Sequence, residues 1–460
     1  EAITTNADTH TTTIADGATD PGRSLFLKYT GTLDSACTIT IAPNTVSKLW
    51  FIENGTSGSQ NILISQGSGA NVTIPAGQTK AVYSNGGGSG AAMVDAFATL
   101  NVVDLLVDDD LTVTDDVAIG GALAVTGDYS STTSGTSNLR LGVNAGNSIA
   151  SGGNYNVVVG DEAGTALTTG DGNVAVGYQA LKTEDANGES TALGYRALMT
   201  QNAGAAAYNV AVGYDTGLDL TTGVRNTLLG TFAGSNITSG GSNVAIGYNS
   251  LGTEDGHGFN TAVGYQTLKF LNAGADAYNV AVGYQAGLNV TTGIDNVLIG
   301  GLAGDALTDA DMNVAVGKNA LGSDTLGSMS VAIGNGSLTT QNFTTATNTY
   351  NIGIGQGAGS SITTGVRHTI IGGLAGDAFT DGGNNVALGY RALTTETGGS
   401  ASVAIGSLSL ENQNTNNVNY NTAVGYGSGQ SVTTGVENTL IGGLAGDALT
   451  DADYNVAVGK

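Results

Sequence analysis

Residues 279–283 read Asn-Val-Ala-Val-Gly, and variants of this phrase recur from residue 138 to residue 460. Nineteen copies are present, and most follow one another at intervals of 17 residues. Their last glycines are residues 142, 160, 177, 194, 213, 230, 247, 264, 283, 300, 317, 334, 355, 372, 389, 406, 425, 442 and 459. A short, fixed period is typical of solenoids, whose coils stack on one another. The repeat therefore predicts a long, stiff rod rather than an enzyme pocket.

A second period lies above the first. The intervals run 17, 17, 17 and then 19 or 21, so that four coils make a unit of about 70 residues. Duplication of a four-coil block explains this pattern. The extra residues of the four units lie at 199–208, 270–278, 340–350 and 411–420. Since insertions in solenoids map to loops on one face, we expect longer turns on the same side of the rod.

Each phrase alternates with period two, which is the pattern of a β-strand. The residue before the glycine is aliphatic in every copy, and the residue two places earlier is Val or Thr except at Leu139 and Ile352. The residue between them is usually Ala and in some copies Leu or Ile. We expect the consistently aliphatic positions to point into the coil. The central residue would then lie on an opposite face that is at least partly covered.

The residues that flank each strand predict how the coils turn and stack. The glycine allows a sharp turn that other residues would make only with strain. Asn precedes the strand in fifteen copies, Ser in three and His368 in one. Stacking would align these side chains as a ladder along the rod. With strands about 4.8 Å apart, eighteen steps span roughly 85 Å.

Composition agrees with an exposed, glycine-turned rod. Gly supplies 74 of 460 residues and Pro only 3, while charged residues make up 11%. The chain carries 38 acidic and 13 basic residues, for a net charge of −25. Such a charge argues against nucleic acid or an anionic membrane surface as a partner, and solubility of the rod accounts for it. The single cysteine, Cys37, excludes an intrachain disulfide.

The N-terminal third differs from the repeats. Residues 1–22 are rich in Thr and Asp, and we expect an extended lead-in. Residues 23–97 alternate short apolar runs with Gly and Asn turns, which predicts a small β-sandwich. Its expected strands are 24–29, 38–41, 48–52, 61–64, 71–74 and 81–83, with Trp50 and Phe51 in the core.

Residues 98–136 form a short acidic stretch that is too thin to bury its apolar residues alone. Winding with copies from other chains would bury them, so we expect an intertwined, trimeric β stem. Residues 137–460 would then form the parallel β-roll or β-solenoid of about 19 coils. The chain stops at Lys460, one residue after a coil's glycine, which predicts a rod truncated at its C-terminal end.

Tyrosine is the best candidate for a surface function. Eight tyrosines follow the coil glycines directly, namely Tyr178, Tyr195, Tyr214, Tyr248, Tyr265, Tyr284, Tyr390 and Tyr426. A row of aromatic rings on a rod can bind sugars by stacking. Stacking between coils or at a chain interface is the interpretation that we favour.

Other chemistry is weakly indicated. Residues 300–307 come near the Gly-Gly-x-Gly-x-Asp-x-Leu phrase of calcium-binding repeats, but such sites need these turns on adjacent coils. Here the turn recurs every fourth coil, with Asp305, Asp377 and Asp447, so solvated turn aspartates are favoured over calcium. Solvated aspartates are likewise favoured over calcium for the acidic cluster at 108–110. The three histidines are scattered, and neither a catalytic constellation nor a metal-ligand spacing is evident. We expect no enzyme, cofactor or metal.

The phrases at 279–283 and at 330–334, Ser-Val-Ala-Ile-Gly, resemble the head repeats of trimeric autotransporter adhesins of the YadA type. Those heads are left-handed parallel β-rolls in a trimer, and their coils are shorter than the present ones. The stretch 111–127 and the domain around 48–83 look more like tail fibres of bacteriophages, especially cyanophages. Together these resemblances cover nearly the whole chain.

The resemblance implies a homotrimeric tail fibre in the virion, outside the cell. Its N-terminal end would join a phage tail or baseplate protein, and it would reach a host surface glycan or outer-membrane protein during adsorption. One alternative is a bacterial trimeric surface adhesin, which carries a membrane anchor. Another is a polysaccharide-degrading tailspike, which shows paired carboxylates in a groove. An ice-binding solenoid is a third, but Thr pairs recur only every fourth coil.

Overall fold

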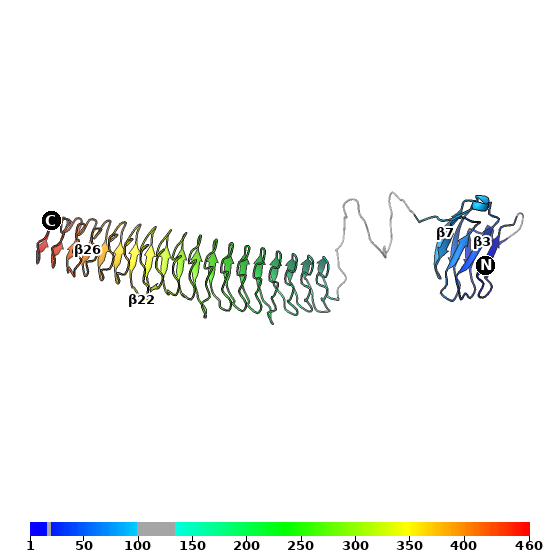
Figure 1. The fold of residues 1–460 in the computed structure, drawn as a ribbon, viewed down its shortest axis with the longest axis horizontal. Coiled ribbons are helices and arrows are strands. Elements are labelled where there is room, and N and C mark those ends of the chain that lie inside the picture. The colour runs from blue at the N-terminus through cyan, green and yellow to red at the C-terminus, as the bar shows by residue number, and fades with distance from the viewer. Residues whose placement is uncertain (16–19, 99–133) are drawn as a thin grey trace. The chain divides into compact units, whose positions relative to one another are not determined.

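The structure is a computed structural model that describes residues 1–15, 20–98 and 134–460. The chain divides into two compact units, residues 1–123 and 124–460, and each is described by itself. Figure 1 shows small sheets in the first unit and a stack of coils in the second. Most of the stem predicted at 98–136, including the acidic cluster at 108–110, lies outside the described residues.

Within residues 1–15 and 20–98, the N-terminal unit contains two four-stranded sheets that share one core. One sheet has the order β1 (Thr9–Thr13), β3 (Cys37–Ala42), β5 (Ile62–Ser65), β6 (Val72–Ile74), and the other β2 (Phe26–Tyr29), β4 (Leu49–Asn54), β7 (Thr79–Ser84), β8 (Met93–Asp95). Two short 3-10 helices, η1 (Pro21–Arg23) and η2 (Gly88–Gly90), connect strands. Ile39 and Ile64 of the first sheet and Trp50 of the second belong to the same buried cluster. The predicted small β-sandwich is confirmed.

Two details of the N-terminal prediction are wrong. Residues 1–22 are not only a lead-in, because β1 pairs in parallel with β3 and Ile3 is buried in the core. The sandwich therefore begins earlier than predicted. Trp50 is buried as expected, but Phe51 is 38% exposed. Alternation along β4 sends the two neighbours to opposite faces of the sheet, so both could not lie in one core.

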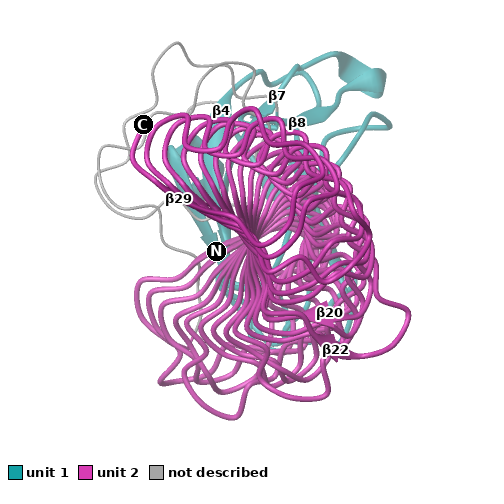
Figure 2. Ribbon diagram, turned by 90° about the vertical axis from the view of Figure 1, so that its left-hand side faces the viewer, with its two compact units in different colours: residues 1–123 teal, residues 124–460 magenta. Residues whose placement is uncertain are grey.

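The second unit is a parallel β-solenoid of 19 coils, as predicted. Each coil contributes one three-residue strand to a single sheet, in which every strand pairs in parallel with the strand of the next coil, as β17 does with β18. The strands are β9 (Leu139–Leu141), β10 (Val157–Val159), β11 (Val174–Val176), β12 (Thr191–Leu193), β13 (Val210–Val212), β14 (Thr227–Leu229), β15 (Val244–Ile246), β16 (Thr261–Val263), β17 (Val280–Val282), β18 (Val297–Ile299), β19 (Val314–Val316), β21 (Val331–Ile333), β23 (Ile352–Ile354), β24 (Thr369–Ile371), β25 (Val386–Leu388), β26 (Val403–Ile405), β27 (Thr422–Val424), β28 (Thr439–Ile441) and β29 (Val456–Val458). Figure 2 looks along the stack and shows successive coils rotated in one sense.

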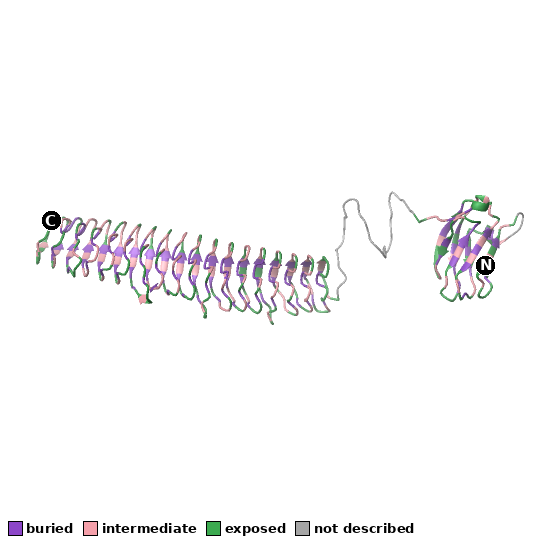
Figure 3. Cartoon of the chain, viewed as in Figure 1, coloured by how far each residue is buried: buried purple, intermediate pink, exposed green. Residues whose placement is uncertain are grey.

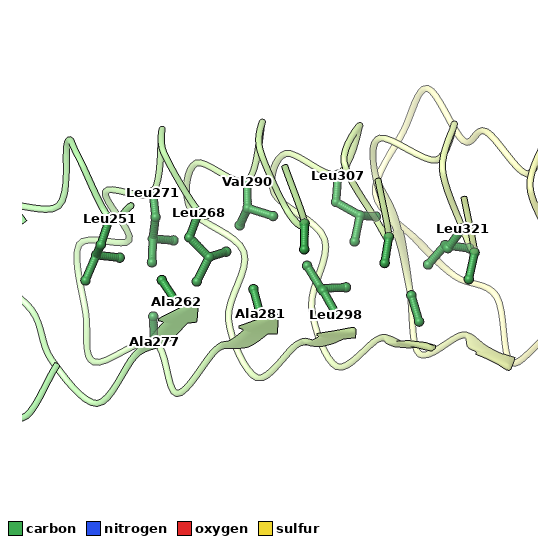
Figure 4. Packing of buried hydrophobic residues seen from close by; sticks show 14 of the residues in the cluster. Leu251, Ala262, Leu268, Leu271, Ala277, Ala281, Val290, Leu298, Leu307 and Leu321 are labelled. Carbon is green, nitrogen blue, oxygen red and sulfur yellow. The ribbon is translucent and has the colours of Figure 1, made fainter. Parts of the chain in front are cut away.

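The predicted orientation of these strands is wrong. The central residue points into the coil and is buried in every coil but the first and the last, as Ala281 and Leu298 illustrate. The flanking aliphatic residues face outward, and Leu229, for example, is 45% exposed. Figure 4 shows Ala281 and Leu298 facing Val290 and Leu307 from the turns across the coil. Because the coil is narrow, a small Ala suits its interior, whereas period two alone does not say which face is inside.

The predicted glycine turns are confirmed. All nineteen glycines that end the strands have φ between 125° and 142°. This region of backbone space is strained for residues that carry a side chain. The stacking is also close, since a Cβ on Gly177 would lie 2.3 Å from the carbonyl oxygen of Gly194. Each turn except the last, at Gly459, therefore requires glycine for two independent reasons.

The insertions are turns with buried anchors and exposed tips. In the first of them Gln201 and Ala207 are buried, whereas residues 204–206 are exposed. The third insertion carries β22 (Thr347–Asn348), which pairs in parallel with β20 (Gly327–Ser328) apart from the main sheet. Figure 3 shows the buried strand centres and the exposed turns of the stack. No helix in residues 1–15, 20–98 and 134–460 has the length and apolar character to cross a bilayer.

Candidate functional site

The asparagines that precede the strands are buried, apart from Asn455 in the last coil, and they join consecutive coils. The Oδ1 of Asn156 accepts the backbone N–H of Asn173 at 2.8 Å, and its Nδ2 donates to the carbonyl of Gly170 at 2.8 Å. Bonds of this kind recur along the stack and run mainly from side chain to backbone. Each is worth about 1 kcal/mol net, and an unsatisfied buried amide would cost more. The predicted ladder is therefore a structural feature rather than a binding site.

His368 takes the place of asparagine in one coil and keeps two of the three ladder bonds, whereas its ring Nδ1 has no hydrogen-bond partner within the described ranges. Its N–H donates to Oδ1 of Asn351 at 3.0 Å, and its Nε2 donates to the carbonyl of Gly382 at 2.8 Å. A carbonyl only accepts, so Nε2 carries the proton of a neutral ring. Burial lowers the pKa of His368 to about 4. The ring therefore stays neutral in the folded chain while an unfolded histidine, with a pKa near 6.5, takes up a proton.

Acidification is expected to destabilise the coil around His368. Between pH 6.5 and pH 4 the unfolded chain binds a proton that the folded chain does not, so stability falls as pH falls. The loss at pH 5 is about 2 kcal/mol. Denaturant unfolding of the wild-type chain and of His368→Asn at pH 7.5 and pH 5 measures it. The variant restores the usual ladder residue. Its loss of stability between pH 7.5 and pH 5 should therefore be about 2 kcal/mol smaller than that of the wild-type chain. Equal losses of stability in the two chains would show that His368 does not cause this pH dependence.

Each four-coil unit buries one carboxylate beside its insertion. These side chains are Glu184, Glu254, Asp324 and Glu396, and all are fully buried. In the first unit Gln201 Nε2 donates to Glu184 Oε2 and to Ser190 Oγ, both at 2.9 Å. Its Oε1 accepts from Nδ2 of Asn209 at 2.9 Å. Gln341 and Gln413 bind their acids in the same way. These donors replace the lost hydration of a buried carboxylate, and they tie the insertion to the stack.

The second unit lacks this glutamine. Leu271 occupies the equivalent position, and Asn260 stands where the other units have serine. The carboxylate of Glu254 accepts the N–H of His257 at 3.2 Å and that of Ala273 at 3.5 Å. Burial is the main cause that raises the pKa of Glu254 above its usual value. This acid is therefore less well compensated than its three counterparts.

Six of the eight predicted tyrosines join one aromatic ladder. The rings in order are Tyr178, Tyr195, Tyr214, Phe232, Tyr248, Tyr265 and Tyr284, with centroid separations of 5.0–6.1 Å. Tyr195 and Tyr265 are each stacked on both sides. Phe232 meets its neighbours edge to face. It was not among the predicted residues because it lies two residues after the coil glycine rather than one.

The ladder geometry bears on sugar binding. A sugar that stacks on an aromatic ring needs an uncovered ring face, but neighbouring rings cover both faces of Tyr195 and Tyr265. The favoured interpretation, stacking between coils, therefore fits this part of the rod. Tyr390 and Tyr426 are 53% and 60% exposed and stack on no other ring within the described ranges. Sugar stacking stays a prediction for these two residues.

The outward residues of the strands form a continuous apolar surface, which we call the outer strand face. It comprises the first and third residues of the 19 strands, all of them Val, Leu, Ile or Thr. Leu193, Leu229 and Leu388 are each more than 40% exposed on it. A strip roughly 85 Å long and about 7 Å wide has an area on the order of 600 Å². This is at the upper end of the apolar patches that soluble monomers expose.

The aspartates of the calcium-like turns do not assemble. Burial raises the pKa of Asp305, and Asp377 accepts a hydrogen bond from Thr394. Within the described ranges, the side chains whose ligand atoms come together in a group of three are Glu254, Asp255 and His257. No metal-ligand spacing was predicted here, because the three histidines are scattered along the sequence. Comparison of the chain with protein families, curated proteins and solved structures finds no match.

Proposed function

We propose that this chain is a structural fibre of a bacteriophage tail, assembled as a homotrimer. The observation that carries the assembly is the outer strand face, which is free of charge along all 19 coils although the chain has a net charge of −25. Water-exposed aliphatic residues in so regular a column are stabilised when other surfaces cover them. Three rods packed on these faces would bury them symmetrically and leave the acidic residues outside.

The proposed role is mechanical reach and attachment. A stack of coils joined by parallel strand pairing and buried ladder bonds is stiff, and three parallel chains would make it stiffer. The fibre would belong to the virion outside the cell, with a tail or baseplate protein at its N-terminal end. A host surface glycan or outer-membrane protein would be its target. Three identical chains present each contact three times, so weak contacts made together give large avidity. The acidic surface disfavours nucleic acid as a partner.

The assembly is tested by mass in solution. Sedimentation equilibrium of the full chain should give three times the chain mass of 45.5 kDa. The double variant Leu229→Glu/Ile299→Glu places charges on the outer strand face and should give single chains, because buried unpaired charges are costly. Thr222→Glu, at an exposed residue away from the strands, is the matched control and should remain trimeric. A monomeric wild-type chain, or a trimeric double variant, would refute the proposed interface.

The biological system is tested by location. Electron microscopy with gold-labelled antibody against residues 138–460 should place gold on fibres that project from virion tails. Gold on cell envelopes with bare virions would instead indicate the bacterial adhesin. Incubation of the trimer with host polysaccharide should release no sugar fragments. Release of fragments would favour the tailspike and would leave the trimeric assembly intact.

A further inference from the structure

The turn between β15 and β16 contains a group of side chains that the proposed fibre does not use. Glu254, Asp255 and His257 each offer one ligand atom, and the three atoms lie within 4.8 Å of one another. Glu254 has no exposed surface, whereas the side chain of His257 is 29% exposed. The group therefore has a buried end and an end that solvent reaches.

The imidazole nitrogen that faces the carboxylate is left without a partner. His257 Nδ1 is shielded from solvent and has no hydrogen-bond partner within the described ranges. It lies 3.4 Å from Oε1 of Glu254. Two lone pairs that face each other across this distance would repel, so either a hydrogen on Nδ1, which the neutral ring can also carry, or a metal ion must lie between the two atoms.

The separation distinguishes these two possibilities. A charge-assisted N–H···O bond brings its heavy atoms to about 2.7–2.9 Å. Ligand atoms bound to one tetrahedral zinc ion at about 2.0–2.1 Å stand roughly 3.4 Å apart. The observed 3.4 Å matches the edge of a metal site better than the hydrogen bond. Small rotations of Asp255, which is exposed, would complete the ligand set.

The other three units show what is missing around Glu254. Each of their acids accepts a glutamine Nε2, as Glu184 does from Gln201 at 2.9 Å. Leu271 cannot provide this donor. Asp276 lies close by and accepts the N–H of Gly258 at 3.1 Å, which adds a further carboxylate to the surroundings. A bound cation would offset this excess of negative charge.

We propose that Glu254, Asp255 and His257 bind one divalent transition-metal ion, with zinc as the best fit. Two carboxylates and one imidazole are a donor set that zinc accepts, and a water molecule from the exposed side can fill the fourth position. The ion would compensate the negative charge of the buried acid in the second unit, as the glutamine does in the other units. Its role is structural. The inference does not depend on the proposed function.

Zinc binding by the full chain tests the proposal. After treatment with a chelator and dialysis, isothermal titration with zinc chloride should show one saturable site per chain. His257→Asn should abolish it and is expected to fold, because Asn187 occupies the same place in the first unit and donates to Glu184 at 3.1 Å. His368→Asn removes a distant histidine and should keep the site. Zinc should raise the unfolding temperature of the wild-type chain but not of His257→Asn.

Two further measurements identify the ligands and the class of ion. With cobalt in place of zinc, the visible spectrum should show tetrahedral nitrogen and oxygen ligation, and Glu254→Gln should remove it. An excess of calcium should not displace the ion, since calcium prefers sites of oxygen alone. Absence of saturable binding would overturn the proposal. Binding that His257→Asn leaves unchanged would overturn it as well, and would indicate an adventitious ion elsewhere, for example at His10 and Glu1.

Discussion

Replacing Gly283 by alanine is expected to destabilise the rod locally by about 4 kcal/mol. Gly283 has a φ of 142°, where a side chain strains the backbone by about 1–3 kcal/mol. A Cβ there would also lie 2.5 Å from the carbonyl oxygen of Gly300 in the next coil. Overlap of this kind costs about 1–3 kcal/mol more, because the backbone must move. The two effects add, since one arises within the turn and the other between coils.

The change should be confined to a few coils, because solenoid stability is approximately a sum of local contributions. Hydrogen exchange followed by mass spectrometry should show faster exchange in residues 261–300 and unchanged exchange in residues 420–442. Gly301→Ala is the matched control. Gly301 has no positive φ, and a Cβ there meets nothing within 4 Å. Similar hydrogen exchange in Gly283→Ala and Gly301→Ala would show that the turn at residue 283 does not require glycine.

Replacing Gln413 by leucine is expected to cost about 4 kcal/mol. Gln413 Nε2 donates to Glu396 and Ser402 at 2.9 Å, and its Oε1 accepts from Asn421 at 2.8 Å. All three partners are buried. Each group left without its bond costs about 1–3 kcal/mol, and the carboxylate is the most costly. Denaturant unfolding, with exchange of residues 396–421 as a local probe, measures the loss.

The second unit provides the control for this prediction. There Leu271 occurs together with Asn260, whereas the other units combine glutamine with serine. Ser402→Asn in the background of Gln413→Leu copies the second unit and should recover part of the lost stability. The coupling free energy from the double-mutant cycle should be at least about 1 kcal/mol, as expected for residues in one network. Additive effects of the two substitutions would show that the leucine and the asparagine of the second unit do not compensate for each other.

The period and its glycines predicted the architecture of the rod because they act locally. A glycine such as Gly177 is required by its own backbone angle and by the coil next to it, and both requirements repeat at every turn. The orientation of the strands could not be read in the same way. Val174 and Ala175 alternate in either orientation, and only the narrow interior of the folded coil selects Ala175.

The buried acids were not predicted from the sequence for a different reason. Glu184, Gln201 and Asn209 come from three successive stretches of chain, so their contacts depend on how an insertion folds back over the stack. A signal was present nonetheless, because an acid recurs at the same place in every four-coil unit. The aromatic row was predicted from the position of tyrosine after glycine, but Phe232 joins it from a different position.

The pairing of the buried acid with its glutamine also restricts which insertions and deletions of coils the chain can tolerate. Glu396 and Gln413 belong to neighbouring coils, so loss of one coil would separate a carboxylate from its donor. Loss or gain of a whole four-coil unit brings an acid and a glutamine together again at the junction, except where the junction uses Leu271 of the second unit. Recombination between units is therefore tolerated in steps of about 70 residues, each worth roughly 19 Å of reach. Variants of the gene should differ in length by whole multiples of this step, and comparison of their sequences would reveal it.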